Sequence, residues 1–208
     1  MTIRNTKKYI MALGAILTWA TLLLQLYISV TKDHATIYIA PFLLLRFFTI
    51  VGNLCVALFW TLSLLGKRRA MSKFFGLTGC AACVASYITL VMLGYALLLQ
   101  HAWNPQGLEL LAERLLHAVI PPLFIVYWFI FEPKEELDWK SPLRWTPFLL
   151  VYYAYSLTLS SFIGKYPYPF FDVNKLGWGE VFGWAFVLWG LFIAIGWFYT
   201  IMNSLKKR

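Results

Sequence analysis

The chain alternates between long apolar runs and short polar stretches. Residues 9–30, 47–66, 74–99, 145–164 and 181–205 contain no Asp, Glu, Lys or Arg. A helix needs roughly 20 apolar residues to cross the hydrocarbon core of a bilayer, so each run is long enough. A sixth apolar run, residues 115–131, contains His117 as its one side chain that titrates near neutral pH. Extended to flanking residues, the pattern predicts six spans at 9–30, 44–66, 74–99, 113–131, 145–164 and 179–205.

The spans are predicted to be helices. They lack the alternation of apolar and polar residues that is typical of membrane β-strands, and a helix satisfies its backbone hydrogen bonds within one segment. No long linker separates the spans, which predicts a single membrane domain over residues 1–208. Composition agrees, because 13% of the residues are charged, against roughly 25% in soluble domains. The predicted fold class is therefore an all-α polytopic membrane protein.

The basic residues predict how the helices are oriented. Most of them lie in connections on one side of the spans, at Arg4, Lys7, Lys8, Lys67, Arg68, Arg69, Lys73, Lys134, Lys140, Arg144, Lys206, Lys207 and Arg208. The other side holds Lys32, Arg46, Arg114, Lys165 and Lys175. Because cytoplasmic connections carry the excess of Lys and Arg, both termini are predicted to be cytoplasmic. A nucleic-acid partner is not expected, because the net charge of +9 is spread over short separate connections.

Two local patterns concern packing and exposure. Gly179 and Gly183 form a GxxxG motif in the last span, and Gly190 continues the same small-residue face. Such faces allow close approach of helices, so packing within the membrane is expected there.

The acidic residues after the fourth span are expected to form a solvated connection; they are Glu132, Glu135, Glu136 and Asp138.

His117 is the polar residue that most needs an explanation. An ionisable side chain inside a membrane span is costly and by default marks a functional site. Pro121 and Pro122 follow it by four and five residues. Proline has no N–H to donate, so the carbonyls of His117 and Ala118 lose their helical partners and the helix is predicted to kink. The alternative is that His117 packs as a polar residue with a backbone partner.

Thr49 is predicted at the same depth as His117. The second and fourth spans both begin on the outer side, and at roughly 1.5 Å per residue the two side chains lie about one turn inside it. A neutral imidazole can take a proton from a hydroxyl and return it to a leaving group. A threonine hydroxyl becomes a useful nucleophile when such a base adjoins it. Thr49 and His117 are therefore the candidate catalytic residues.

Arg46 and Asn53 lie one turn on either side of Thr49 and share its predicted helix face. Either side chain could stabilise a developing oxyanion. Three alternatives stay open. Arg46 could reach outer lipid headgroups, Asn53 could join two helices by a hydrogen bond, and Thr49 could bond its own helix.

The orientation of His117 is expected to depend on a carboxylate. Glu113 lies one turn before it on the same face, and Asp172 lies in an outer connection; either could act as the third member of a triad. That connection is rich in proline and aromatic residues, which suits a stiff segment at headgroup level. Aromatic residues of this region are the candidate substrate-pocket residues: Tyr155, Tyr166 and Tyr168.

Three stretches carry these residues, at positions 46–54 (RFFTIVGNL), 116–122 (LHAVIPP) and 166–172 (YPYPFFD). Together with the number and order of spans, they resemble the androgen-induced protein superfamily of six-span membrane proteins, and most closely its bacterial branch. Eukaryotic members are threonine hydrolases that cleave fatty acid esters of hydroxy fatty acids. The resemblance implies that Thr49 and His117 are the catalytic threonine and histidine of such a hydrolase. It also implies that the protein lies in a bacterial cytoplasmic membrane.

The leading hypothesis is thus an intramembrane hydrolase of lipid esters, with a membrane acyl-ester lipid as substrate and neither metal nor cofactor. The alternative is a non-enzymatic membrane protein that binds or carries a lipid or small molecule in an outer-facing pocket. A metal site built from His34, His101 and His117 is a third possibility, but these residues lack a fixed ligand spacing.

Overall fold

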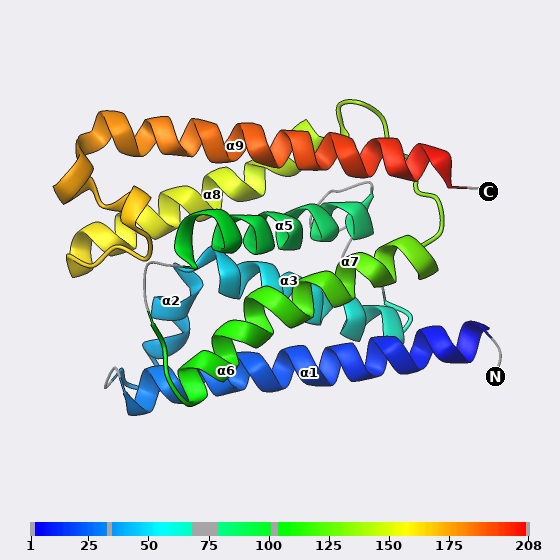
Figure 1. The fold of residues 1–208 in the computed structure, drawn as a ribbon, viewed down its shortest axis with the longest axis horizontal. Helices are drawn as coiled ribbons and strands as arrows, with labels where there is room; N and C mark the ends of the chain where they lie inside the picture. The colour runs from blue at the N-terminus through cyan, green and yellow to red at the C-terminus, as the bar shows by residue number, and fades with distance from the viewer. Residues whose placement is uncertain (1–2, 33–34, 68–78, 101–103, 207–208) are drawn as a thin grey trace.

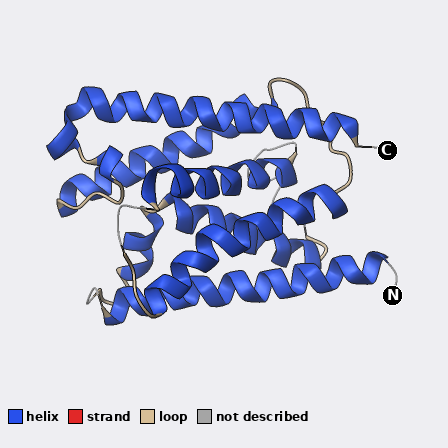
Figure 2. Ribbon diagram, in the orientation of Figure 1, coloured by secondary structure: helices blue, strands red, loops and turns tan. Residues whose placement is uncertain are grey.

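The computed structural model describes residues 3–32, 35–67, 79–100 and 104–206, and its regular elements there are all helices (Figure 2). Within this part, 5 helical stretches are long and apolar enough to cross a membrane. They are Arg4–Thr31, Cys80–Leu99, Leu108–Phe131, Ser141–Ile163 and Val173–Leu205. The helix at Phe48–Leu64 is apolar but shorter. The all-α class is confirmed, and each of the six predicted spans overlaps one of these helices, although residues 74–78 of the third span lie outside the described part.

The helices lie roughly side by side, with α1 along one edge and α9 along the opposite edge (Figure 1). Both chain ends lie at the same end of the molecule in that view. Between the edges, α3 packs on α1 and α5, and α5 packs on α7 and α9. The elements are α1 (Ile3–Thr31), α2 (Ala40–Leu45), α3 (Phe48–Leu64), α5 (Cys80–Gly94), η1 (Tyr95–Leu99), α6 (Leu108–Arg114), η2 (Leu115–Val119), α7 (Ile120–Phe131), α8 (Ser141–Ile163), η3 (Pro169–Phe171) and α9 (Val173–Leu205).

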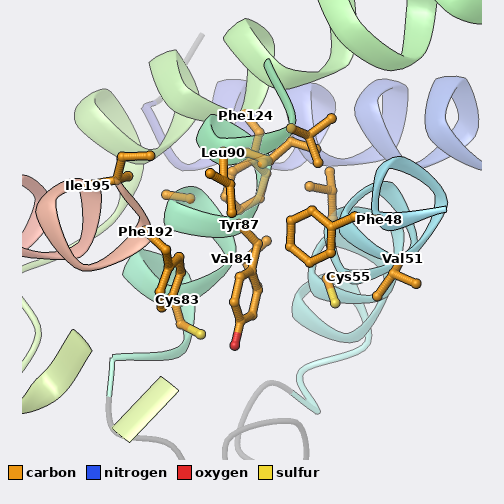
Figure 3. Close-up of a cluster of buried hydrophobic side chains, with 14 of the residues drawn as sticks. Phe48, Val51, Cys55, Cys83, Val84, Tyr87, Leu90, Phe124, Phe192 and Ile195 are labelled. Carbon is orange, nitrogen blue, oxygen red and sulfur yellow. The ribbon is translucent and has the colours of Figure 1, made fainter. Parts of the chain in front are cut away.

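Aromatic side chains fill the centre of the bundle, around α5 (Figure 3). Tyr87 stacks on Phe192 of α9 with ring centroids 5.2 Å apart, and meets Phe48 of α3 edge-on at 6.0 Å. Its hydroxyl donates to the Trp145 carbonyl at 2.6 Å. This single buried residue therefore joins α5 to α3, α8 and α9.

The glycines that allow close helix contact are not the ones expected. At three positions an added Cβ would collide with a neighbouring helix: Gly14 against Trp60, Gly52 against Val91, and Gly196 against Pro142. A Cβ at Gly179, Gly183 or Gly190 would meet no atom within 4 Å. The GxxxG face of α9 therefore does not pack against the described part of this chain, and the expectation of internal packing there was wrong.

The second span is interrupted near its N-terminal end. The α2 helix ends at Leu45, and Phe47 is extended, so α3 begins only at Phe48. Arg46 therefore does not share a helix with Thr49, contrary to the expectation of one continuous helix from residue 44. The break frees the Arg46 carbonyl, which accepts hydrogen bonds from Tyr152 at 2.7 Å and Ser156 at 2.8 Å. The interruption is stabilised because α8 supplies donors for a carbonyl that has left the helical pattern.

The fourth span is irregular at His117, as the two prolines predict. The irregularity is a π-helical turn, η2, in which the Ile120 N–H donates to the Leu115 carbonyl five residues back. Residues Leu116 and His117 would need donors at Pro121 and Pro122 to continue this pattern, and proline has none. The span at 74–99 also ends in a π-helical turn, η1. Such turns often occur at functional sites.

The acidic connection after α7 is not simply solvated. Glu132 is buried, accepts a hydrogen bond from Tyr127 at 2.6 Å and pairs with Lys7 of α1 at 3.2 Å. The Glu135 carboxylate accepts from the Ala81 and Ala82 N–H groups at 3.2 and 3.1 Å. A carboxylate at this place satisfies unpaired N–H groups in the first turn of α5. The two residues connect the ends of α1, α5 and α7, which corrects the expected solvated loop.

Candidate active site

Thr49 and His117 meet between α3 and η2. The distance from Thr49 Oγ1 to His117 Nε2 is 3.0 Å, and both side chains are buried. Thr49 lies in the first turn of α3, directly after the break that starts this helix. His117 lies in the π-helical turn before Pro121. The two irregular backbone segments thus present the two side chains to each other.

The hydrogen bonds of His117 determine its tautomer. Its Nδ1 lies 2.9 Å from the backbone carbonyl oxygen of Glu113. A carbonyl oxygen can only accept, so Nδ1 carries the proton and donates it. In the neutral imidazole Nε2 is then an acceptor, and Thr49 Oγ1 donates to it. This is the arrangement in which a histidine can act as a base toward a hydroxyl.

The third group that orients the imidazole is therefore the main-chain oxygen of Glu113. Sequence reasoning assigned this role to the carboxylate of Glu113 or Asp172. The structure corrects both: Asp172 caps the start of α9, accepting from the Lys175 N–H at 3.3 Å and pairing with the Lys175 ammonium at 3.3 Å. The Glu113 carbonyl lies one helical turn before His117, at the point where α6 passes into the π-helical turn.

Asn53 holds the two segments together. Its Nδ2 donates to the carbonyl of Thr49 at 2.8 Å and to the carbonyl of Leu116 at 3.2 Å. The Leu116 carbonyl is the one that Pro121 leaves without a π-helical donor. A side-chain amide nitrogen has two N–H groups, and both are used here, so none remains for an oxyanion. The structure therefore supports the alternative in which Asn53 joins two helices, next to both candidate catalytic residues.

Tyr95 covers the face of the imidazole. The two rings are stacked with centroids 4.1 Å apart and planes inclined by 20°. The ring therefore limits the rotation of His117 from one side, while the Glu113 carbonyl holds it at Nδ1. Sequence reasoning missed Tyr95, although its place near the C-terminal end of the span at 74–99 puts it at a depth similar to that of His117.

Tyr168 lies at the start of α3 beside Thr49. The Phe48 N–H donates to the Tyr168 hydroxyl at 2.8 Å, and the backbone and hydroxyl of Thr49 also interact with it. Burial raises the pKa of Tyr168, so this hydroxyl keeps its proton over the physiological range. The expectation placed Tyr168 in a substrate pocket, and it does line the cavities at Thr49.

Three other predicted site residues have different surroundings. The Arg46 guanidinium donates to the Lys165 carbonyl at 2.9 Å, which connects α2 to the segment before η3. The Tyr155 hydroxyl donates to the Phe42 carbonyl at 2.7 Å. Tyr166 packs against the hydrophobic core. None of the three is among the described residues that line the cavities at Thr49. Arg46 and Tyr155 therefore connect segments that lie far apart in the sequence.

Two cavities have Thr49 in their walls. One is mostly apolar, has a volume of about 140 Å³ and lies between α5, α8 and α9. The other has a volume of about 360 Å³ and includes the polar side chains of Gln25, Asn104, Glu109, Glu113 and His117. The second volume lies within the range of roughly 300–1,000 Å³ that is usual for ligand pockets. The site can therefore admit an organic substrate to the Thr49 hydroxyl.

A metal site has no support in the described residues, which contain no group of three or more His, Cys, Asp or Glu side chains able to hold an ion. Two residues of the expected histidine set, His34 and His101, lie outside the described part.

Comparisons of the chain with protein-family models, with characterised proteins and with solved structures find no match. The functional assignment therefore depends on the geometry of the site.

Proposed function

We propose that this protein is an intramembrane hydrolase of lipid esters in which Thr49 is the nucleophile and His117 the general base. The observation that carries the proposal is the 3.0 Å contact between Thr49 Oγ1 and the unprotonated Nε2 of His117. A structural threonine in a membrane helix usually bonds the carbonyl four residues back. Thr49 instead lies against an oriented base, in the walls of two cavities.

The first half of the reaction forms an acyl-enzyme. Thr49 Oγ1 attacks the ester carbonyl carbon while its proton passes to His117 Nε2. The resulting imidazolium is stabilised by the Glu113 carbonyl at Nδ1. The bond from the carbonyl carbon to the alkoxy oxygen then breaks. His117 returns the proton to that oxygen, so a neutral alcohol leaves and the acyl group remains on Thr49.

The second half releases the acid. A water molecule gives a proton to His117 Nε2 and attacks the acyl carbon, and the bond to Thr49 Oγ1 breaks. His117 returns the proton to Thr49, which restores the starting state. The products are one fatty acid and one alcohol, and no external oxidant, reductant or metal ion is consumed.

The negative charge that develops on the carbonyl oxygen needs a donor. Arg46 and Asn53 were the candidates from sequence, but Arg46 is not among the residues that line the cavities at Thr49, and the Asn53 amide bonds two backbone carbonyls. The Tyr168 hydroxyl is the better candidate, because it retains its proton and interacts with Thr49. The first turn of α3 adds the partial positive charge of a helix N-terminus at the same place.

The proposal includes the placement of this site near the outer face of a bacterial cytoplasmic membrane, with both termini inside. It is supported by the excess of basic residues at the end of the bundle that holds the termini. A membrane-impermeant maleimide should label Lys165→Cys in intact cells and Lys140→Cys only after permeabilisation. The native cysteines Cys55, Cys80 and Cys83 are buried and give a low background. The reverse labelling pattern would refute the orientation.

The nucleophile can be tested with a fluorophosphonate probe on the purified protein in detergent. Attack by Thr49 Oγ1 on phosphorus expels fluoride and leaves a stable adduct. We expect labelling of the wild type and of Thr49→Ser, and none of Thr49→Ala. Thr18→Ala is the matched control, because Thr18 is buried in α1 and its hydroxyl bonds the Gly14 carbonyl. Equal labelling of wild type and Thr49→Ala would contradict the proposal and favour a lipid-binding or carrier protein.

A further inference from the structure

The cavities at Thr49 differ in chemistry. The residues common to both are Thr49, Leu99 and Tyr168. The apolar cavity continues along one side of α5 and η1, and its remaining wall is made of aliphatic and aromatic residues of α8, α9 and the η3 segment. The second cavity lies on the other side, between α1, α3 and α6. Much of its wall is also apolar, but it contains the carboxylates of Glu109 and Glu113, and we call it the polar cavity for them. An ester at Thr49 therefore has two unlike environments for its two halves.

The position of His117 determines which half of the ester lies in which cavity. His117 contributes to the wall of the polar cavity, whereas the described lining of the apolar cavity does not include it. In the proposed reaction His117 must deliver a proton to the departing alkoxy oxygen and later take one from water. Both tasks require the alcohol, and then the water, to occupy the cavity that the imidazole faces. The acyl chain then occupies the apolar cavity.

We propose that the substrate is an ester of an unbranched fatty acyl chain with an uncharged, polar alcohol. The acyl chain lies in the apolar cavity and the alcohol in the polar cavity. This inference rests on the proposed hydrolase function and specifies its substrate. It extends the proposed reaction by fixing the direction in which the ester lies across Thr49.

The shape of the apolar cavity fits a chain that comes from the bilayer. From Leu99 to Leu90 the cavity follows the α5–η1 segment over nine residues, or roughly 14 Å at 1.5 Å per residue. Its outer wall includes Leu150 of α8 and Trp189 of α9, whose side chains are 61% and 39% exposed on the membrane-facing surface. The apolar cavity therefore has residues in its wall that also face the surroundings of the bundle, and an acyl chain there stays in an apolar environment.

The charge of the polar cavity selects against an anionic alcohol. Two carboxylates line it, and the Glu109 carboxylate is partly neutralised by Lys32 at 2.6 Å. Glu113, whose backbone carbonyl orients His117, adds a second carboxylate to the same cavity. Like charges brought together in a partly desolvated site repel strongly. A free carboxylate or phosphate on the alcohol is therefore disfavoured, while hydroxyl groups can donate to these acids.

Gly94 provides a direct test of the acyl site. It lines the apolar cavity, and a Cβ added there would meet no atom within 4 Å. Gly94→Leu should fill part of the cavity and reduce kcat/KM for a dodecanoyl ester by about tenfold. The rate for the butanoyl ester of the same alcohol should change little. Gly190→Leu is the matched control, since Gly190 is exposed on α9, has the same open surroundings and is not in the described lining. Ala185→Phe narrows the same cavity from α9. This variant provides the same test of chain-length preference if Gly94→Leu does not fold.

The location of the chain can be measured without turnover. A non-hydrolysable amide of dodecanoic acid with a terminal diazirine is photo-crosslinked to the wild-type protein in lipid nanodiscs, and the labelled peptides are identified by mass spectrometry. We expect labels on lining residues such as Val91 and Leu188, lost in Gly94→Leu and kept in Gly190→Leu. Labels on polar-cavity residues such as Leu44 and Ile50 would overturn the inference. Labels in the apolar cavity without hydrolysis of any ester would instead refute the proposed function and leave the acyl site standing.

The alcohol is tested with the acyl chain held constant. The dodecanoyl ester of glycerol should be cleaved with a kcat/KM about tenfold or more above that of the dodecanoyl ester of glycolate, which carries a carboxylate. Glu113→Gln should narrow this ratio. Equal or faster cleavage of the glycolate ester by the wild type would overturn the inference about the alcohol, while the hydrolase proposal would stand.

Discussion

Replacing His117 with glutamine or alanine is expected to lower the rate of ester hydrolysis by about a thousandfold or more. General acid–base catalysis contributes roughly 10²–10⁴-fold, and a weak nucleophile such as a threonine hydroxyl depends on it. Glutamine keeps a polar group near Thr49 Oγ1 but cannot cycle a proton at neutral pH. The measurement is kcat/KM for a dodecanoyl ester with the purified variants in detergent.

A structural role of His117 would give a different result. If the imidazole only filled space beside Tyr95 and the prolines, glutamine would retain much of the rate and would mainly lower the unfolding temperature. When two residues act as a unit, the effects of replacing them on the rate do not add. The double variant Thr49→Ala/His117→Ala should therefore be hardly slower than either single variant. Losses that multiply in the double variant would contradict a nucleophile–base pair.

The second large effect is expected at Asn53. Asn53→Leu removes the donor from the Leu116 carbonyl, which Pro121 cannot replace. Leaving one buried carbonyl unsatisfied costs about 1–3 kcal/mol. We expect a lower unfolding temperature in detergent, together with a fall in kcat at nearly unchanged KM, because the η2 turn that positions His117 loses its tie to α3.

Ser86→Ala is the matched control for this variant. Ser86 is fully buried in α5, and its hydroxyl donates to the Ala82 carbonyl of its own helix at 2.8 Å. Its removal should change stability by less than about 1 kcal/mol and leave kcat unchanged. If Asn53→Leu lowered stability as expected but left kcat at the wild-type value, Asn53 would be a packing residue with no positioning role.

The two cavities also qualify the resemblance drawn from the sequence. Esters of hydroxy fatty acids, the substrates that the resemblance implies, have a leaving group with a long apolar chain and a free carboxylate. The cavity on the His117 side contains Glu109 and Glu113. Its chemistry favours an uncharged, polar alcohol, so we expect the substrate of this chain to differ in the alcohol and to agree in the acyl group.

Much of the fold was predictable because a membrane span is a property of one segment. The runs at 145–164 and 181–205 are apolar enough to cross a bilayer whatever they pack against, and the structure has α8 and α9 there. The break before α3 was not predictable, because it depends on donors that Tyr152 and Ser156 bring from α8. The open surroundings of Gly183 likewise depend on which helix lies opposite, and the motif itself contains no such information.

The sequence by itself determined that Thr49 and His117 lie at one depth, because the rise of a helix converts residue number into depth. It also determined that the helix around His117 is irregular, because Pro121 and Pro122 carry no N–H. Only the tertiary structure decided that the two side chains touch, that the Glu113 carbonyl sets the tautomer, and that Asn53 and Tyr95 hold the imidazole in place. Hydrogen bonds and ring contacts act over a few ångströms, so they depend on which faces of distant helices meet, and helical spacing along the chain does not specify that.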